Sequence, residues 1–224
     1  VGGGGGIGNE AGDVTVISNN QASLKDAETL KDIATISTLG DLSHGIAAKS
    51  IGGGGGQGGF AGNFSLNYGN NKGMPGTPQP QSSSLSASVT IGGGGGTGNR
   101  AGDVYVDSTD NIVTKGINAI GIKAESIGGG GGSGGKALDV NINATEGTGI
   151  DLGVTLGGKG GSGSLAGQVQ VDSEGLIITE GDYSHAVYAK SLGGGGGDGG
   201  FAVTGSLSSN VATFQANASV GDRK

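Results

Sequence analysis

Hydrophobic and polar residues alternate with a period of two along most of the chain. One such stretch has apolar residues at Leu85, Ala87, Val89 and Ile91, and another has them at Ile150, Leu152, Val154 and Leu156. Side chains two residues apart lie on one face of a β-strand, whereas a helix face needs a spacing of three or four. Helical spacing is nearly absent, so the pattern predicts an all-β fold.

These stretches adjoin a glycine-rich motif that recurs six times in one register. Runs of five glycines occupy 2–6, 52–56, 92–96, 128–132 and 193–197, and a run interrupted by Lys159 occupies 157–161. A branched apolar residue precedes each run, and ten residues after it stands an alanine: Ala11, Ala61, Ala101, Ala137, Ala166 or Ala202. Such regularity predicts a single repeat array over 1–224.

Two kinds of copy alternate along the array. The first kind follows a Gly-Ile-x-Ala-Lys/Glu-Ser-Ile motif, as at 45–51 and 121–127, and the same pattern is slightly altered at 186–192. The second kind follows plain alternation, as at 85–91. Residues 214–220 resemble the approach to a seventh run, so we expect the chain to be a fragment of a longer array.

Insertions account for the unequal spacing of the copies. The apolar residues that precede successive runs are 50, 40, 36, 29 and 36 residues apart. The longest interval carries an insertion at 21–32, whose beginning at Ser23 resembles a helix capping box, so a short helix is expected over 23–31. A second insertion at 70–81 holds all three prolines and predicts an exposed loop.

A repeat of about 30 residues with two or three short strands cannot bury an apolar face alone, but stacked repeats can, at about 4.8 Å per step. The sequence therefore predicts a β-solenoid, similar to a parallel β-helix, with stacked polyglycine segments. Glycine packs no side chain, so we expect these segments to allow a close approach of two backbones. The fixed phase to the next strand opposes the reading of the runs as flexible linkers.

Two conformations of the glycine runs remain open. If each run continues a flat strand, the even places Gly93 and Gly95 face inward with the apolar residues before the run, and odd places such as Gly94 face outward. Lys159 occupies an odd place, as this arrangement requires. The alternative is a threefold, polyproline-II-like strand. The flat reading also predicts a β-bulge near Ser50, Ser126 and Ser191, where the apolar phase shifts by one residue.

Composition and charge narrow the possible functions. Glycine supplies 56 of 224 residues, only 14% are charged, and there is no cysteine. An ordinary enzyme core, a disulfide scaffold and a Cys-ligated zinc site are therefore disfavoured. The net charge of −7 opposes binding to nucleic acid or to an anionic membrane surface. No apolar run is long enough for a spanning helix, so we expect this fragment not to be membrane-inserted.

Several motifs mimic functional sites. His44 and His185 stand seven residues before the apolar residue of their copies, and Ile120 takes the matching place, so we interpret them as one solenoid rung. The phosphate-loop-like stretch at 153–159 lacks the Ser or Thr that would hold magnesium, and 193–198 resembles a single calcium-binding nonapeptide without tandem copies. Asp13, Asp103 and Asp139 recur two residues after the alanine and are interpreted as outward strand positions. We therefore predict no catalytic, cofactor-binding or metal-binding residues, and no enzyme activity.

The elements at 189–200, Ala-Lys-Ser-Leu-Gly-Gly-Gly-Gly-Gly-Asp-Gly-Gly, and at 48–59 resemble the glycine-rich repeats of large bacterial autotransporter passengers. The resemblance covers essentially the whole chain. It implies a type V secreted protein with a signal, a long solenoid passenger and an outer-membrane barrel, located outside the cell or on its surface. Such passengers are commonly adhesins, and the resemblance carries over no catalytic residue.

These inferences predict a structural or adhesive module, either a stiff β-solenoid rod or a self-associating surface fibre. A host or cell-surface ligand is a second possible partner. One alternative is a carbohydrate-binding module on the two insertions. A less favoured alternative is a solenoid polysaccharide hydrolase, which would need carboxylates that converge in a cleft. An ice-binding face would need a regular threonine ladder, which Thr15, Thr90, Thr155 and Thr204 do not form.

Overall fold

A computed structural model describes residues 1–19, 35–69, 84–145, 148–208 and 212–221 of the chain. Over these residues the chain forms fifteen β-strands and no helix, which confirms the all-β prediction. The helix expected over 23–31 lies outside the described residues.

The strands fall into three successive coils of five. The first coil holds β1 (Val14–Ser18), β2 (Ile36–Thr38), β3 (Ile46–Ile51), β4 (Ala61–Gly69) and β5 (Ser84–Ile91). The second holds β6 (Val104–Ser108), β7 (Ile112–Thr114), β8 (Ile122–Ile127), β9 (Ala137–Thr145) and β10 (Thr148–Leu156). The third holds β11 (Val169–Ser173), β12 (Ile177–Thr179), β13 (Val187–Leu192), β14 (Ala202–Ser208) and β15 (Ala212–Val220).

Equivalent strands of the three coils pair in parallel and in register. They make five three-stranded sheets: β1-β6-β11, β2-β7-β12, β3-β8-β13, β4-β9-β14 and β5-β10-β15. Val14 pairs with Val104, and Val104 with Val169, so each full coil contains two glycine-rich segments. The β-solenoid is thus confirmed, but its unit is twice the predicted length. Each coil contains one copy of each kind, which explains why the two kinds alternate.

The first coil is longer than the second, and the strand registers show where its extra residues lie. The pairing of β1 with β6 and of β2 with β7 makes 19–35 of the first coil the counterpart of only 109–111 in the second. In the same way, 70–83 is the counterpart of 146–148. The predicted insertions at 21–32 and 70–81 fall within stretches that the structure does not describe, and the flanking registers agree with their positions.

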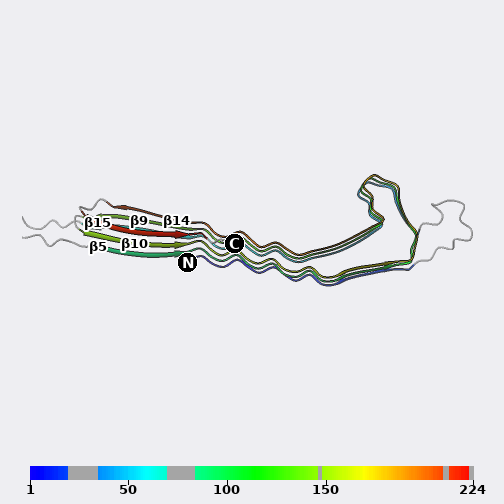
Figure 1. Ribbon diagram of the computed structural model, residues 1–224, viewed down its shortest axis with the longest axis horizontal. Helices are drawn as coiled ribbons and strands as arrows, with labels where there is room; N and C mark the ends of the chain where they lie inside the picture. Colours follow the sequence, from blue (N-terminus) through cyan, green and yellow to red (C-terminus); the bar gives the residue numbers. More distant parts are fainter. Residues whose placement is uncertain (20–34, 70–83, 146–147, 209–211, 222–224) are drawn as a thin grey trace, which may run out of the picture.

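Each coil is long and narrow and has three parts (Figure 1). We call the six strands β4, β5, β9, β10, β14 and β15 the blade; most of them are labelled at one end of the molecule in Figure 1. The glycine-rich segments 1–11, 51–61, 91–101, 127–137, 156–166 and 192–202 form the middle part, here called the glycine slab. The remaining strands, β1–β3 and their equivalents, form the core end. The N-terminus lies where the blade meets the slab.

The core end has the ordinary polarity of a soluble protein. Its buried cluster consists of Ile46, Ala48, Val104, Val106, Ile112, Ile122 and Ala124. Strand β3 alternates without interruption, with Ile46, Ala48 and Ser50 inward. The predicted β-bulge at Ser50 is therefore wrong: the serine takes an inward place, and Ile51 points out with 57% of its surface exposed. Strands β8 and β13 keep the same unbroken pairing through Ser126 and Ser191.

Candidate functional site

The glycine slab has a hydrogen-bond pattern with a period of three. The Gly92 N–H donates to the Leu156 carbonyl at 2.9 Å, and the Gly95 N–H donates to the Lys159 carbonyl at 2.7 Å. Both bonds run to the equivalent segment of the next coil. The Gly93 and Gly96 N–H groups instead donate to Gly59 and Gly56, at 3.0 and 2.8 Å, in the opposite layer. In each group of three residues, one N–H thus donates to the same layer in the next coil and one donates to the opposite layer.

This pattern is that of threefold polyglycine strands arranged in two layers. Segments within a layer are parallel, and the layers run antiparallel, because successive donors from Gly93 to Asn99 meet acceptors from Gly59 back to Gly53. A Cβ added to Gly93, Gly95 or Gly96 would lie 1.8–2.0 Å from a backbone oxygen. A Cβ on Gly94 would meet only the Lys159 carbonyl oxygen, at 3.8 Å.

The predicted alternation of even and odd glycines is consequently wrong. Gly96 occupies an odd place and is as closely enclosed as the even place Gly95. A threefold strand turns by about 120° per residue, so every third residue faces outward. The open place at Gly94 and the lysine at Lys159 agree with both readings, which is why they could not separate them.

The sequence nevertheless contained part of the threefold signal. Every copy has a non-glycine residue at the sixth and ninth places after the apolar residue, and these places, with the third, are the outward places of the slab. The eighth place holds Asn9, Asn99 or Ser164 in copies of the second kind, which obscures the period. The third place holds Lys159 in one copy and glycine in the others. The sixth holds Ile7, Gln57, Thr97, Ser133, Ser162 and Asp198, and the ninth holds Glu10, Phe60, Arg100, Lys136, Leu165 and Phe201.

A ladder of serines joins the core end together next to the slab. The Ser126 Oγ donates to the Gly102 carbonyl at 2.9 Å and accepts from the Gly167 N–H at 2.8 Å. Ser50 makes the equivalent pair of bonds to Gly12 and Gly102, each at 2.9 Å. The serine of the Ala-Lys/Glu-Ser motif therefore satisfies backbone groups of two coils at once.

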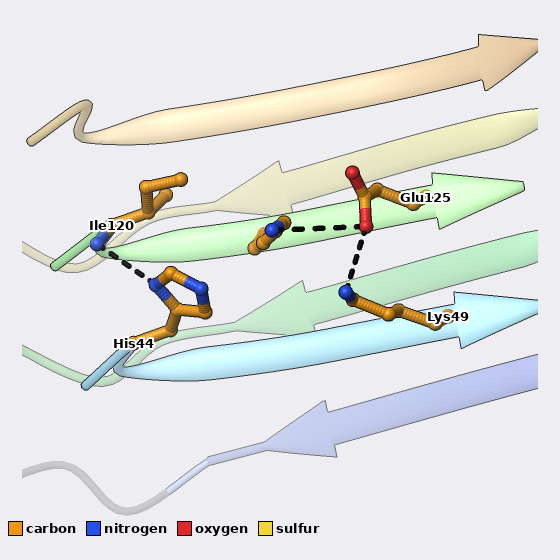
Figure 2. A network of polar contacts seen from close by, with 5 residues as sticks. His44, Lys49, Ile120 and Glu125 are labelled. Atoms are coloured by element: carbon orange, nitrogen blue, oxygen red, sulfur yellow. Dashed lines mark hydrogen bonds and ion pairs between the residues drawn. The ribbon is translucent and has the colours of Figure 1, made fainter. Parts of the chain in front are cut away.

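Titratable side chains gather on the outer face of the β3-β8-β13 sheet (Figure 2). Lys49 and Lys123 approach the same oxygen of Glu125, at 3.0 and 3.8 Å between Nζ and Oε2. His44 lies beside this group and accepts a hydrogen bond on Nδ1 from the Ile120 N–H, at 3.1 Å. The registers of β3 with β8 and of β13 with β8 place His44, Ile120 and His185 at equivalent positions, so the predicted rung is confirmed.

The charges of this cluster act mainly on each other. Burial, and then the positive charges of Lys123 and Lys49, lower the pKa of His44, while Glu125 partly offsets them. Burial alone would raise the pKa of Glu125, but the hydrogen bond from Lys49 and the lysine charges leave that pKa lowered. Both shifts favour a neutral imidazole, whose Nδ1 accepts the Ile120 N–H, and an ionised carboxylate.

The blade has the reverse polarity of the core end. Its inward places carry polar side chains, and Asp139 and Asp151 are both completely buried there. Its outward places carry apolar side chains that remain exposed, such as Phe64 at 66% and Leu85 at 71%. The expectation that Leu85, Val89 and their equivalents face inward is wrong. The alternation is as predicted, but the apolar side is the outer one.

Hydrogen bonds between the two blade sheets explain how the polar residues fill the interior. Asn67 Nδ2 donates to Ser86 Oγ at 2.6 Å, and Asn143 Nδ2 donates to Ser84 Oγ at 2.8 Å. Ser88 bonds to Asp139 and also accepts from Asn141 Nδ2, at 3.1 Å. This network takes the place of an apolar core because most of the buried polar groups find a partner. In the described blade strands, three buried atoms have none: Thr90 Oγ1, Asn141 Oδ1 and Asp151 Oδ2.

The remaining sequence candidates are dispersed. Asp13 and Asp103 each accept a backbone N–H of the next coil, from Asp103 and Gln168, at 2.8 Å. Asp139 is not an outward position as interpreted, since it lies inside the blade. The stretch 153–159 runs from the end of β10 in the blade into the slab, and 193–198 lies in the slab. Within the described ranges, no three His, Asp or Glu side chains come together as metal ligands would.

Comparisons of the chain with protein-family models, curated proteins and solved structures return no match. In the part of the chain that the structure describes, no helix has the length and hydrophobicity to cross a membrane.

Proposed function

We propose that this chain is a structural module of an extracellular bacterial repeat protein, in which it forms a stiff ribbon on the cell surface. The observation that carries the proposal is the in-register stacking of the three coils. All five sheets and both layers of the glycine slab continue from coil to coil without a change of register.

The dimensions of a coil favour a ribbon over a thin rod. A nine-residue blade strand is about 30 Å long, and nine residues of threefold glycine strand add about 28 Å. Each further coil adds only about 4.8 Å along the stacking direction. A long array would therefore be a flat band, many times wider than one stacking step, with hydrogen bonds along its growth axis.

The location outside the cell is supported by the resemblance of segments 48–59 and 189–200 to autotransporter passengers. It is also consistent with the absence of cysteine and with the net charge of −7. Adhesion belongs to the same proposal, because the outward places of each coil are repeated at fixed spacing and could present one surface many times.

A series of chains with three, six and twelve coils tests the structural role. Electron microscopy should show bands of constant width that lengthen by about 4.8 Å per added coil. The melting temperature should rise with coil number, because terminal coils lack one neighbour. A compact particle with no fixed width would contradict the proposal. Antibody labelling of intact and permeabilised cells tests the location, and labelling only after permeabilisation would reject it.

A further inference from the structure

We propose that the two outer faces of the blade bind the blades of further copies of this chain, so that ribbons associate side by side. This inference rests on the proposed structural function and names the surface and the partner. The front face is the outer side of the β4-β9-β14 sheet, and the rear face is the outer side of the β5-β10-β15 sheet.

Exposed apolar side chains cover both faces. Leu66 and Leu207 on the front face are 60% and 68% exposed, and Leu85 and Val89 on the rear face are 71% and 66% exposed. No outward place of the blade strands carries a charge within the described residues. The core end of the same chain buries an apolar cluster, although Ile17, Leu39 and Leu42 are exposed there. Among the described residues, a polar interior beneath an apolar outer face is therefore confined to the blade.

The area of these faces argues for a partner. Three strands of about eight residues cover a footprint of roughly 400 Å² per face. The largest apolar patch on a typical monomer measures about 300–600 Å² and is often functional, and here two patches of that size lie on opposite sides of one blade. A specific complex buries about 800 Å² on each partner. The faces of three coils therefore support weak association, and every added coil enlarges the interface.

A second blade fits these faces better than a lipid bilayer does. Among the described residues, the outward places of the blade lack the lysine and arginine that draw proteins to membrane surfaces. Uncharged sheets, by contrast, pack face to face about 10 Å apart.

Sedimentation velocity of the 224-residue chain over a range of concentrations tests the inference. The native chain should form dimers and larger species at rising concentration. Leu66→Lys with Leu207→Lys blocks the front face, and Leu85→Lys with Val89→Lys blocks the rear face. Each pair should raise the concentration needed for association at least about tenfold, and all four together should give monomers.

The matched control is Ile7→Lys with Leu165→Lys, which places the same charges on exposed outward places of the slab. Because the chain is acidic, added lysines reduce its net charge, so a loss of association in the blade variants cannot come from general repulsion. The control should associate as the native chain does. Circular dichroism confirms that each variant is folded.

Three results would overturn the inference: a native chain that stays monomeric, blade variants that associate like the control, or a monomeric chain that floats with neutral phosphatidylcholine vesicles. The last result would identify lipid as the partner. None of them affects the coil series, so the proposed structural function can stand when this inference fails.

Discussion

At the residue scale, glycine is required in the slab because backbone atoms occupy the space of a side chain. In the inner segments of the slab, such as 92–98 and 128–134, two faces of the threefold strand are enclosed and the third is open. At the edge of the stack, Gly3 and Gly6 are open as well. This geometry converts a usually destabilising residue into a packing element, since hydrogen bonds to two neighbours replace side-chain contacts.

An alanine series over 92–96 should therefore show a period of three. Gly92→Ala, Gly93→Ala, Gly95→Ala and Gly96→Ala should each lower the free energy of unfolding by about 3 kcal/mol, the upper end for overpacking, since backbone must move. Gly94→Ala should cost less than about 1 kcal/mol, because its Cβ would meet nothing closer than 3.8 Å. Urea unfolding measures the series. A loss of stability at every second place would instead support the flat-strand conformation. Equal losses at all five places would reject ordered packing of the glycines.

His44 makes the stability of the folded chain depend on pH. The pKa of His44 is lowered in the folded chain, so below about pH 6.5 the unfolded chain binds a proton that the folded chain resists. Stability should fall as the pH drops from 6.5 towards the folded pKa. His44→Gln should remove this part of the slope.

Glu125 acts in a lower window and in the same direction. Its pKa is lowered by folding, so its contribution is present above about pH 4.5 and is lost as the pH falls through the folded pKa. Glu125→Gln should flatten the profile below pH 4.5. It should also enlarge the upper window, because the Glu125 charge partly offsets the lowered pKa of His44. Urea unfolding at several pH values separates the two windows, and profiles that stay parallel to that of the native chain would contradict both assignments.

At the element scale, the serine ladder fixes the β3-β8-β13 sheet to the chain segments that lead into β1, β6 and β11. Ser126 in the central coil is fully buried and makes both of its bonds, while Ser191 in the last coil is exposed and donates only to Gly167. Equivalent serines should therefore contribute differently to the free energy of unfolding, depending on the coil in which they lie.

Ser126→Ala should lower the free energy of unfolding by about 1–3 kcal/mol, because it leaves the Gly102 carbonyl and the Gly167 N–H without their partner. Ser191→Ala should cost clearly less. Ser133→Ala, at an outward place of the slab, is the control and should change stability by less than about 0.5 kcal/mol. Equal losses at Ser126 and Ser133 would show that the ladder contributes nothing specific.

At the scale of the whole molecule, three environments lie side by side along every coil. The core end buries apolar side chains, the slab buries backbone, and the blade buries polar side chains. The continuous hydrogen-bond register through all three keeps the coils aligned, so the stack does not depend on one large hydrophobic core.

The two insertions lie between strands of this frame that pair in register with the next coil. Replacement of 19–35 by the sequence of 109–111, and of 70–83 by that of 146–148, would give the first coil the length of the second. Each replacement alone should raise the free energy of unfolding by roughly 1–2 kcal/mol, because shorter loops cost less entropy to close. Urea unfolding measures both, and loss of folding would show that the insertions belong to the structural unit.

The sequence by itself determined that the protein is a β repeat array, because side-chain periodicity and copy number are properties of the chain alone. It also located both insertions and the alternation of the two kinds of copy. Only the tertiary structure decided which side of the blade strands faces the interior. The alternation at 85–91 has the same period whichever side faces in, and the opposing sheet with Asp139 and Asn143 selects the polar side. The threefold turn of the slab was decided in the same way. A run such as 92–96 has no side chains to mark its phase, and the residues after it mark every third place only in part. The hydrogen bonds of its neighbours therefore set its conformation.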